Sequence, residues 1–139
     1  MWTDDLTVGI WEIDTQHRAL FAQLEKLLDA CMVGRELEEV MEMIVFLDGY
    51  VDTHFEAEEH LQREGGYPEY EKHRAEHLIF RTNLERLKAE LVESGATRDL
   101  VLRVNQVLID WLKTHIRNVD AAMSEFLLKK SGQPADMRQ

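Results

Sequence analysis

The chain has 139 residues, of which 45% are hydrophobic and 31% are charged, which is typical of a single globular domain spanning residues 1–139. Its net charge of -11 disfavours nucleic acids and anionic membranes as partners, and no apolar run approaches the roughly 20 residues of a membrane-spanning helix. The single cysteine, Cys31, excludes an intrachain disulfide, and the absence of signal-peptide features at the N-terminus completes the prediction of a cytoplasmic location.

A short N-terminal arm, residues 1–14, lacks helical periodicity and precedes four amphipathic stretches. Apolar residues recur in each stretch at steps of three and four, as at Leu20, Leu24 and Leu27, and this spacing predicts a helix. The predicted helices cover residues 15–33, 36–64, 68–93 and 97–130. The polar tail, residues 131–139, is expected to be frayed.

Glycine-containing breaks separate the stretches: Gly34 after the first, Gly65-Gly66 after the second and Ser94-Gly95 after the third. Pro68 suits the first turn of the third helix, and Thr97 is the predicted N-cap of the fourth. Short connections between long helices make neighbours antiparallel. The predicted fold is therefore all-α, an up-down-up-down antiparallel four-helix bundle.

Five histidines, one glutamate and one aspartate lie on or beside the apolar stripes. They are His17, His54, Glu58, His73, His77, His115 and Asp120. His54 and Glu58 are four residues apart, and so are His73 and His77, which places each pair on one helix face. Donors converging from four helices predict a two-metal site. Imidazole and carboxylate ligands together suit iron, manganese, zinc or copper.

The alternative to a metal site is a set of ordinary buried polar residues. A single buried histidine is a hydrogen-bonded core residue in roughly half of such cases. Seven buried donors on four helices are harder to explain in this way, because unpaired buried polar groups are unfavourable. Without metal the two carboxylates would need protons or counter-ions, and few basic residues occupy nearby stripe positions.

Short segments around these donors follow one another in a specific order and spacing. They are Ile13-Asp14-Thr15-Gln16-His17, His54-Phe55-Glu56-Ala57-Glu58-Glu59, Gly66-Tyr67-Pro68, His73-Arg74-Ala75-Glu76-His77, and Trp111-Leu112-Lys113-Thr114-His115-Ile116 followed by Asp120. The ordered set resembles the hemerythrin family in its single-domain bacterial form. The likeness covers nearly the whole chain, and all seven ligand positions match.

The resemblance implies a centre of two iron ions per chain with an oxo or hydroxo bridge. It implies these ligands: His73, His77 and His115 on one iron, His17 and His54 on the other, and Glu58 and Asp120 bridging both. The iron with two histidines then keeps an open position, where dioxygen would bind. Helical adjacency and the resemblance together place Phe55, Trp111, Leu112 and Ile116 around an apolar oxygen pocket, although core packing alone would explain these four residues.

Gln62 stands where the family commonly has an apolar residue, usually methionine. It lies four residues beyond Glu58 and therefore on the inward face of its helix. A buried amide needs partners, so Gln62 is expected either to line the oxygen pocket or to bond a neighbouring helix.

The resemblance predicts reversible dioxygen binding by an oxygen carrier, store or scavenger that is not an enzyme. Two alternatives stay open: an oxygen or iron sensor that acts through a partner, and a weak di-iron oxidase or peroxidase. The sequence does not determine whether there is a protein partner and is compatible with a monomer. Metal content, oxygen release and autoxidation rate would separate these possibilities.

Overall fold

The computed structural model describes residues 2–95 and 97–130, and the predicted frayed tail lies outside this part of the chain. No strand occurs among the described residues. The elements in chain order are η1 (Asp4–Leu6), α1 (Trp11–Met32), α2 (Leu37–Gly65), α3 (Tyr70–Ser94), α4 (Arg98–Arg103), η2 (Val104–Asp110), α5 (Trp111–His115), η3 (Ile116–Asp120) and α6 (Ala121–Lys130).

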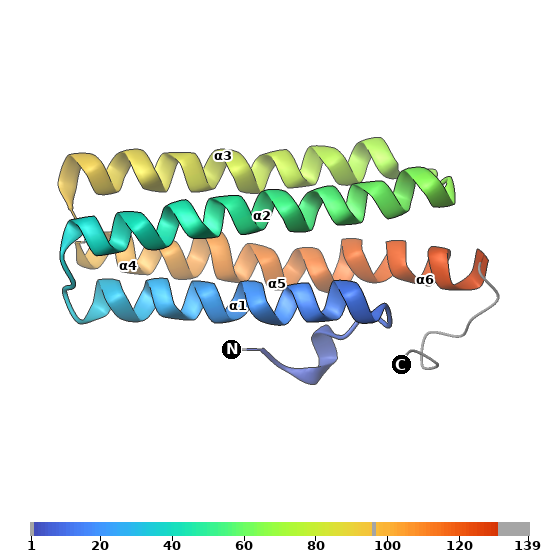
Figure 1. The fold of residues 1–139 in the computed structure, drawn as a ribbon, viewed down its shortest axis with the longest axis horizontal. Helices are drawn as coiled ribbons and strands as arrows, with labels where there is room; N and C mark the ends of the chain where they lie inside the picture. The colour runs from blue at the N-terminus through green and yellow to red at the C-terminus, as the bar shows by residue number, and fades with distance from the viewer. Residues whose placement is uncertain (1, 96, 131–139) are drawn as a thin grey trace.

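The elements from α4 to α6 follow one another without a break and form one long rod, the fourth helix of the bundle (Figure 1). Within this rod η2 and η3 are π-helical, and η1 is a short 3-10 turn in the N-terminal arm. Successive rods run in opposite directions, with α1 against α2, α2 against α3, and the fourth rod against both α1 and α3. The predicted antiparallel four-helix bundle is confirmed.

Two glycines end helices as predicted, because both have backbone conformations that disfavour other residues. Gly66 follows α2 with φ of 67°, and the next N–H, from Tyr67, bonds the carbonyl of Gln62 at 2.9 Å. Gly34 follows α1 with φ of 71°. These turns reverse the chain sharply, so consecutive helices become antiparallel neighbours.

The first helix begins earlier than predicted, at Trp11 instead of residue 15, so residues 11–14 belong to α1 and not to the arm. The Asp14 carboxylate accepts the backbone N–H groups of Val8, at 2.8 Å, and Gly9, at 3.2 Å. This buried side chain anchors the arm against the first turn of α1. The acidic groups in the first turn of α1 also stabilise the helix by interacting with the positive end of its dipole.

The third helix begins at Tyr70, because Pro68 lies in the preceding turn and not in the first helical turn. The N–H of Tyr70 bonds the carbonyl of Tyr67 at 3.2 Å and closes that turn. The predicted N-cap of the fourth rod is confirmed, since Thr97 Oγ1 accepts the N–H of Leu100 at 3.2 Å.

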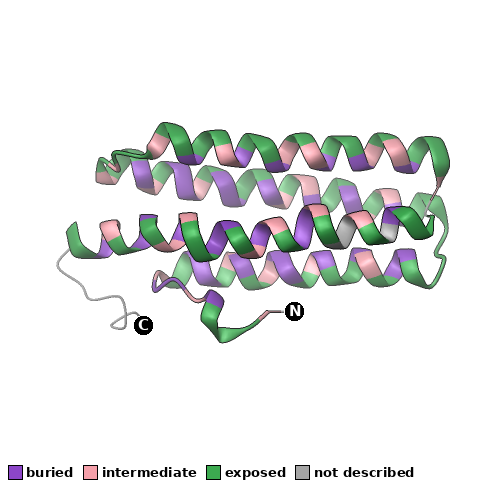
Figure 2. Cartoon of the chain, turned by 180° about the vertical axis from the view of Figure 1, so that it is seen from behind, coloured by how far each residue is buried: buried purple, intermediate pink, exposed green. Residues whose placement is uncertain are grey.

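Buried residues line the helix faces that turn toward one another (Figure 2). The apolar core is a single cluster drawn from the arm and all four rods, and it includes Phe21, Leu24, Leu47, Leu84 and Leu108. No helix within residues 2–95 and 97–130 is long and apolar enough to cross a membrane. The inward stripes therefore serve the bundle interior, where they also carry polar side chains.

Candidate metal centre

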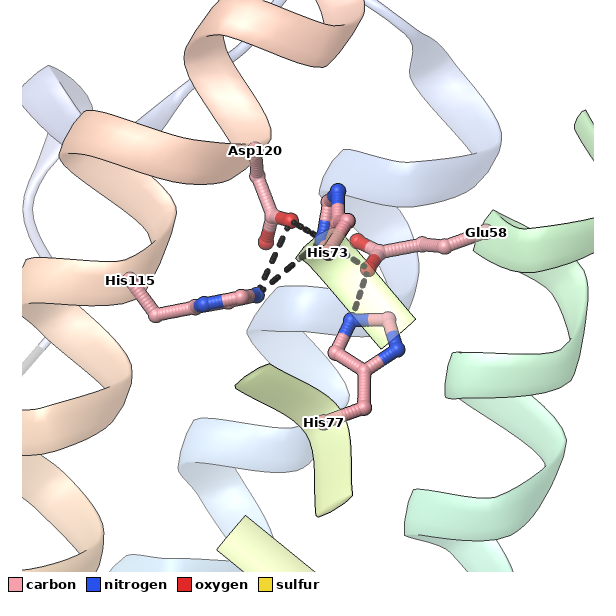
Figure 3. Close-up of side chains that lie close together, drawn as sticks. All are labelled: Glu58, His73, His77, His115 and Asp120. Atoms are coloured by element: carbon pink, nitrogen blue, oxygen red, sulfur yellow. Dashed lines mark hydrogen bonds and ion pairs between the residues drawn. The ribbon is translucent and has the colours of Figure 1, made fainter. Parts of the chain in front are cut away.

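All four rods send polar side chains into one region of the interior, nearer the α2–α3 turn than the opposite end. The seven predicted ligands, each 2% exposed or less, are His17 on α1, His54 and Glu58 on α2, His73 and His77 on α3, His115 on α5 and Asp120 at the end of η3. Five of them point toward one another in Figure 3. Such burial is rare for polar groups without strong partners.

Helical geometry explains how α2 and α3 each present two donors. A step of four residues almost completes a turn, so Glu58 lies above His54 and His77 above His73. His54 Nε2 lies 3.2 Å from Glu58 Oε2 within α2. Across the interface His77 Nε2 lies 3.0 Å from Glu58 Oε1. The two i, i+4 pairs therefore meet face to face.

The two donors of the fourth rod have a different spacing, because His115 and Asp120 are five residues apart. In an α-helix five residues turn the chain by about 500°, which would leave the two side chains about 140° apart. The intervening π-helical turn η3 is wider, and the N–H of Ala121 bonds the carbonyl of Ile116, five residues back. His115 Nε2 consequently lies 3.2 Å from Asp120 Oδ1.

The donors fall into two overlapping sets. In each set one donor atom per residue lies within 4.8 Å of the others, and the sets are Glu58, His73, His77, His115 and Asp120, and His17, His54, Glu58 and Asp120. Glu58 and Asp120 belong to both sets. Their shared position makes them the residues that could bridge two metal ions.

The hydrogen bonding of the cluster leaves several polar atoms unsatisfied. Nitrogen and oxygen atoms approach closely, as where His73 Nε2 lies 2.8 Å from Asp120 Oδ1. Nevertheless no hydrogen bond of acceptable geometry reaches His54 Nε2, His77 Nε2, Glu58 Oε1 or either carboxylate oxygen of Asp120. Buried polar groups rarely lack a hydrogen-bond partner. Lone pairs aimed at a common centre are the arrangement that metal ions require, so the residues fit a metal site.

Opposing effects set the charges of the metal-free cluster. Burial disfavours a charged His17, but Asp120 and Glu58 beside it raise its pKa to about 9. Burial also disfavours a charged His73, but the same two carboxylates raise the pKa of this histidine to about 9. Burial would raise the pKa of Glu58 and Asp120, yet the surrounding imidazoles hold both carboxyls well below their usual range. Protons thus balance the carboxylates where metal cations would do so after loading.

The family model described as "Hemerythrin HHE cation binding domain" matches residues 8–127 of the chain. The chain belongs to the hemerythrin family. The bacteriohemerythrin of Pseudomonas aeruginosa (strain LESB58) is 34% identical over 139 residues, covering 94% of this chain and 88% of the relative.

Other hemerythrin relatives agree in sequence and in structure. The bacteriohemerythrin of Clostridium acetobutylicum is 28% identical, covering 86% of this chain and 95% of the relative. A crystal structure of wild-type hemerythrin is similar with a TM-score of 0.78 and 27% identity. That similarity covers 91% of this chain and 96% of the hemerythrin chain. The helical bundle fold is thus shared with hemerythrin.

Three imidazoles of the cluster have a hydrogen-bond partner for the ring nitrogen that points away from it. The contacts are His54 Nδ1 to Gln16 Oε1 at 2.6 Å, His73 Nδ1 to Gln62 Nε2 at 3.0 Å, and His77 Nδ1 to Glu59 Oε2 at 2.9 Å. His115 Nδ1 lies 3.5 Å from Glu76 Oε1 without a hydrogen bond. Such partners fix the orientation of a ligand ring.

Sequence reasoning assigned no role to Gln16, Glu59 or Glu76. Each of these residues directly precedes or follows a ligand in sequence, which was the available signal. A residue one step along a helix points about 100° away from its neighbour, toward the adjoining helix and the ligands there.

Aromatic rings lie against two of the imidazoles. Phe55 stacks on His77 with ring centres 3.8 Å apart, and Trp111 stacks on His115 at 4.6 Å. Leu112 and Ile116, the other two apolar residues of the predicted oxygen pocket, have no exposed surface. For Gln62, the contact with His73 on α3 supports the second of the two alternatives, bonding to a neighbouring helix.

A cavity of about 260 Å³ borders the cluster at His73. Its other lining residues come from the α2–α3 turn, the start of α3 and the fourth rod, and they are Tyr67, Glu69, Lys72, Glu76, Asn118, Val119 and Ala122. Of the seven donors, His73 is the one that lines this cavity.

Proposed function

We propose that this protein binds dioxygen reversibly at a pair of iron ions and serves as an oxygen carrier, store or scavenger. The sharing of Glu58 and Asp120 by two donor sets carries the proposal, because shared carboxylates are what a two-metal centre needs. The ligands would be His73, His77 and His115 for one iron, His17 and His54 for the other, and Glu58 and Asp120 as bridges together with an oxo or hydroxo group.

The names of the relatives support the choice of metal and ligand. The related proteins are called bacteriohemerythrin or hemerythrin, and the family description names a cation binding domain. The donor types alone would also accept manganese, zinc or copper. Bound irons would supply electrons for reversible dioxygen binding at the position left open beside the two-histidine set.

The residues around the cluster would keep water and protons away from that position. We propose that Phe55, Leu112 and Ile116, which are fully buried, line the oxygen pocket with Trp111. A dry apolar wall allows a bound molecule to leave unchanged, because no further protons reach it.

The donor set also favours binding over catalysis. Five neutral imidazoles and two carboxylates bring less anionic charge to the metals than a carboxylate-rich ferritin-like site does. Lower anionic charge disfavours the highly oxidised iron that an oxidase requires. We therefore propose an oxygen-binding protein and not an enzyme.

The test is a cycle of oxygenation and deoxygenation followed by visible spectroscopy. Protein loaded with ferrous iron under argon should gain an intense absorption in air and lose it again when oxygen is removed. Glu58→Ala should abolish the absorption, since it removes a bridge. Glu56→Ala is the matched control, because that carboxylate lies on the same helix with a side chain that is 67% exposed. Oxidation that cannot be reversed by removing oxygen would contradict the proposal.

A further inference from the structure

Gln62 is a buried amide that contacts two neighbouring helices but is only partly hydrogen-bonded. It lies on α2 one turn beyond Glu58 and has no exposed surface. Its Nε2 lies 3.0 Å from His73 Nδ1 on α3 and 3.0 Å from the sulfur of Met123 on α6. Its carbonyl oxygen, Oε1, has no hydrogen-bond partner among the described residues. The amide therefore has one well-placed group and one unsatisfied group.

The inward nitrogen of His73 belongs to the donor cluster. His73 Nε2 lies 2.8 Å from Asp120 Oδ1 and 3.2 Å from His115 Nε2. A metal ion bound at Nε2 leaves the ring proton on Nδ1, which is then a donor and cannot accept. That donor would point at the amide of Gln62.

A side-chain amide can rotate so that its oxygen, in place of its nitrogen, faces a hydrogen-bond donor. Rotation of the Gln62 amide by half a turn exchanges its oxygen and nitrogen with little change in shape, and such orientations follow the hydrogen-bond network. Oε1 would then accept the Nδ1 proton of His73. The buried carbonyl oxygen of Gln62, which has no partner in the present orientation, thereby gains one.

The neighbouring ligand on α3 has a partner of different charge. His77 Nδ1 lies 2.9 Å from Glu59 Oε2, and the carboxyl group of Glu59 is only 7% exposed. A carboxylate partner draws the ring proton more strongly than an amide does, which makes the imidazole a stronger electron donor to its metal. His73 and His77, one turn apart, thus face partners of unequal strength.

We propose that Gln62 is a positioning residue whose Oε1 accepts a hydrogen bond from the Nδ1–H of His73 in the metal-loaded protein. This contact makes His73 a weaker electron donor to its metal than His77. The inference rests on the proposed metal centre. It predicts that replacing the amide by a carboxylate strengthens His73 as a ligand, and that removing the amide weakens metal binding.

The experiment compares Gln62→Met, Gln62→Glu and the mirrored Glu59→Gln in protein loaded with Co²⁺. The readouts are metal affinity, the proton NMR signals of the exchangeable ring N–H groups shifted by the paramagnetic metal, and the melting temperature of the metal-free protein. Gln106→Met is the matched control, because Gln106 lies exposed on the fourth rod.

Gln62→Met should lower Co²⁺ affinity about tenfold and shift one exchangeable N–H signal, in line with the effect of losing a ligand's outer partner. Its metal-free melting temperature should change little, because removal of a buried carbonyl oxygen without a partner offsets the loss of the two contacts of Nε2. Gln62→Glu should move the His73 signal toward that of His77, and Glu59→Gln should move the His77 signal in the opposite direction.

Three results would overturn the inference. The first is an unchanged affinity and NMR spectrum in Gln62→Met. The second is a fall in affinity matched by a fall in metal-free melting temperature, which would mark Gln62 as a structural residue only. The third is wild-type protein that binds no metal, which would overturn the proposed function as well. Normal metal binding by wild type with an unaffected Gln62→Met would overturn the inference alone.

Discussion

The bundle interior has two halves that are equally buried but chemically opposite. In the apolar half, nearest the α1–α2 connection, side chains such as Phe21, Leu24 and Leu84 fill the space between the rods. In the metal half, nearest the α2–α3 turn, the seven donors occupy the same inward stripes. The same helices and the same spacing therefore build both a core and a site.

The difference between the halves concerns what each needs in order to be stable. Apolar burial is favourable by itself, at about 25 cal/mol for each Å² removed from water. Buried donors are unfavourable until their lone pairs have partners. The apolar half should thus specify the fold alone, whereas the metal half should depend on what it binds.

Metal removal should have the largest effect and should separate the two halves. With free metal a thousandfold above its dissociation constant, binding adds about 4 kcal/mol to the free energy of unfolding. Hydrogen exchange measured by mass spectrometry should show faster exchange around His54 and His73 after stripping, with the segment around Leu84 still protected. A uniform loss of protection along all four rods would show that the halves are not independent.

Leu84→Ala tests the apolar half directly. Leu84 is fully buried, so its truncation should lower the free energy of unfolding by about 2–5 kcal/mol through lost burial and the cavity left behind. The loss should be similar in the metal-loaded and metal-free forms, and the metal content should not change. Urea titrations of both forms give these values.

Leu78→Ala on the same helix is the control, because its side chain is 61% exposed and should contribute little. Leu84→Ala protein that loses its metal would contradict the separation of the two halves.

Asp48→Asn should have the smallest effect and shows what a carboxylate contributes outside the interior. Asp48 Oδ2 accepts a hydrogen bond from Lys88 at 2.8 Å, with both side chains partly exposed. Exposed pairs of this kind typically stabilise by about 0–1 kcal/mol. A thermal melt should therefore differ little from wild type, whereas a large shift would mean that charges at the surface matter as much as those in the metal half.

Most of the fold follows from local patterns in the sequence. Periodic leucines predict the four rods, and Gly34 and Gly66 predict their turns, because both signals act within a few residues. The start of α1 at Trp11 was not predicted, since it depends on Asp14 bonding the backbone of Val8 and Gly9. That contact is a matter of side-chain geometry and leaves no periodic signal.

The site was predictable to the extent that its spacing obeys α-helical geometry. The pairs His54 with Glu58 and His73 with His77 satisfy this condition. Asp120 does not, because its five-residue distance from His115 needs the π-helical turn η3. Its place beside the apolar stripe made it a candidate, and the family resemblance supported its assignment as a ligand. Outer partners such as Gln16, which contacts His54 from another helix, depend on interhelical distances that the sequence does not encode locally.

We propose that the seven buried donors bind two metal ions bridged by Glu58 and Asp120. The most direct test of this proposal is the iron content of reconstituted protein, measured by elemental analysis against protein concentration after free iron has been removed. We expect two irons per chain in wild type and in Glu56→Ala, and a loss of both irons in Glu58→Ala. A single iron or none in wild-type protein would contradict it.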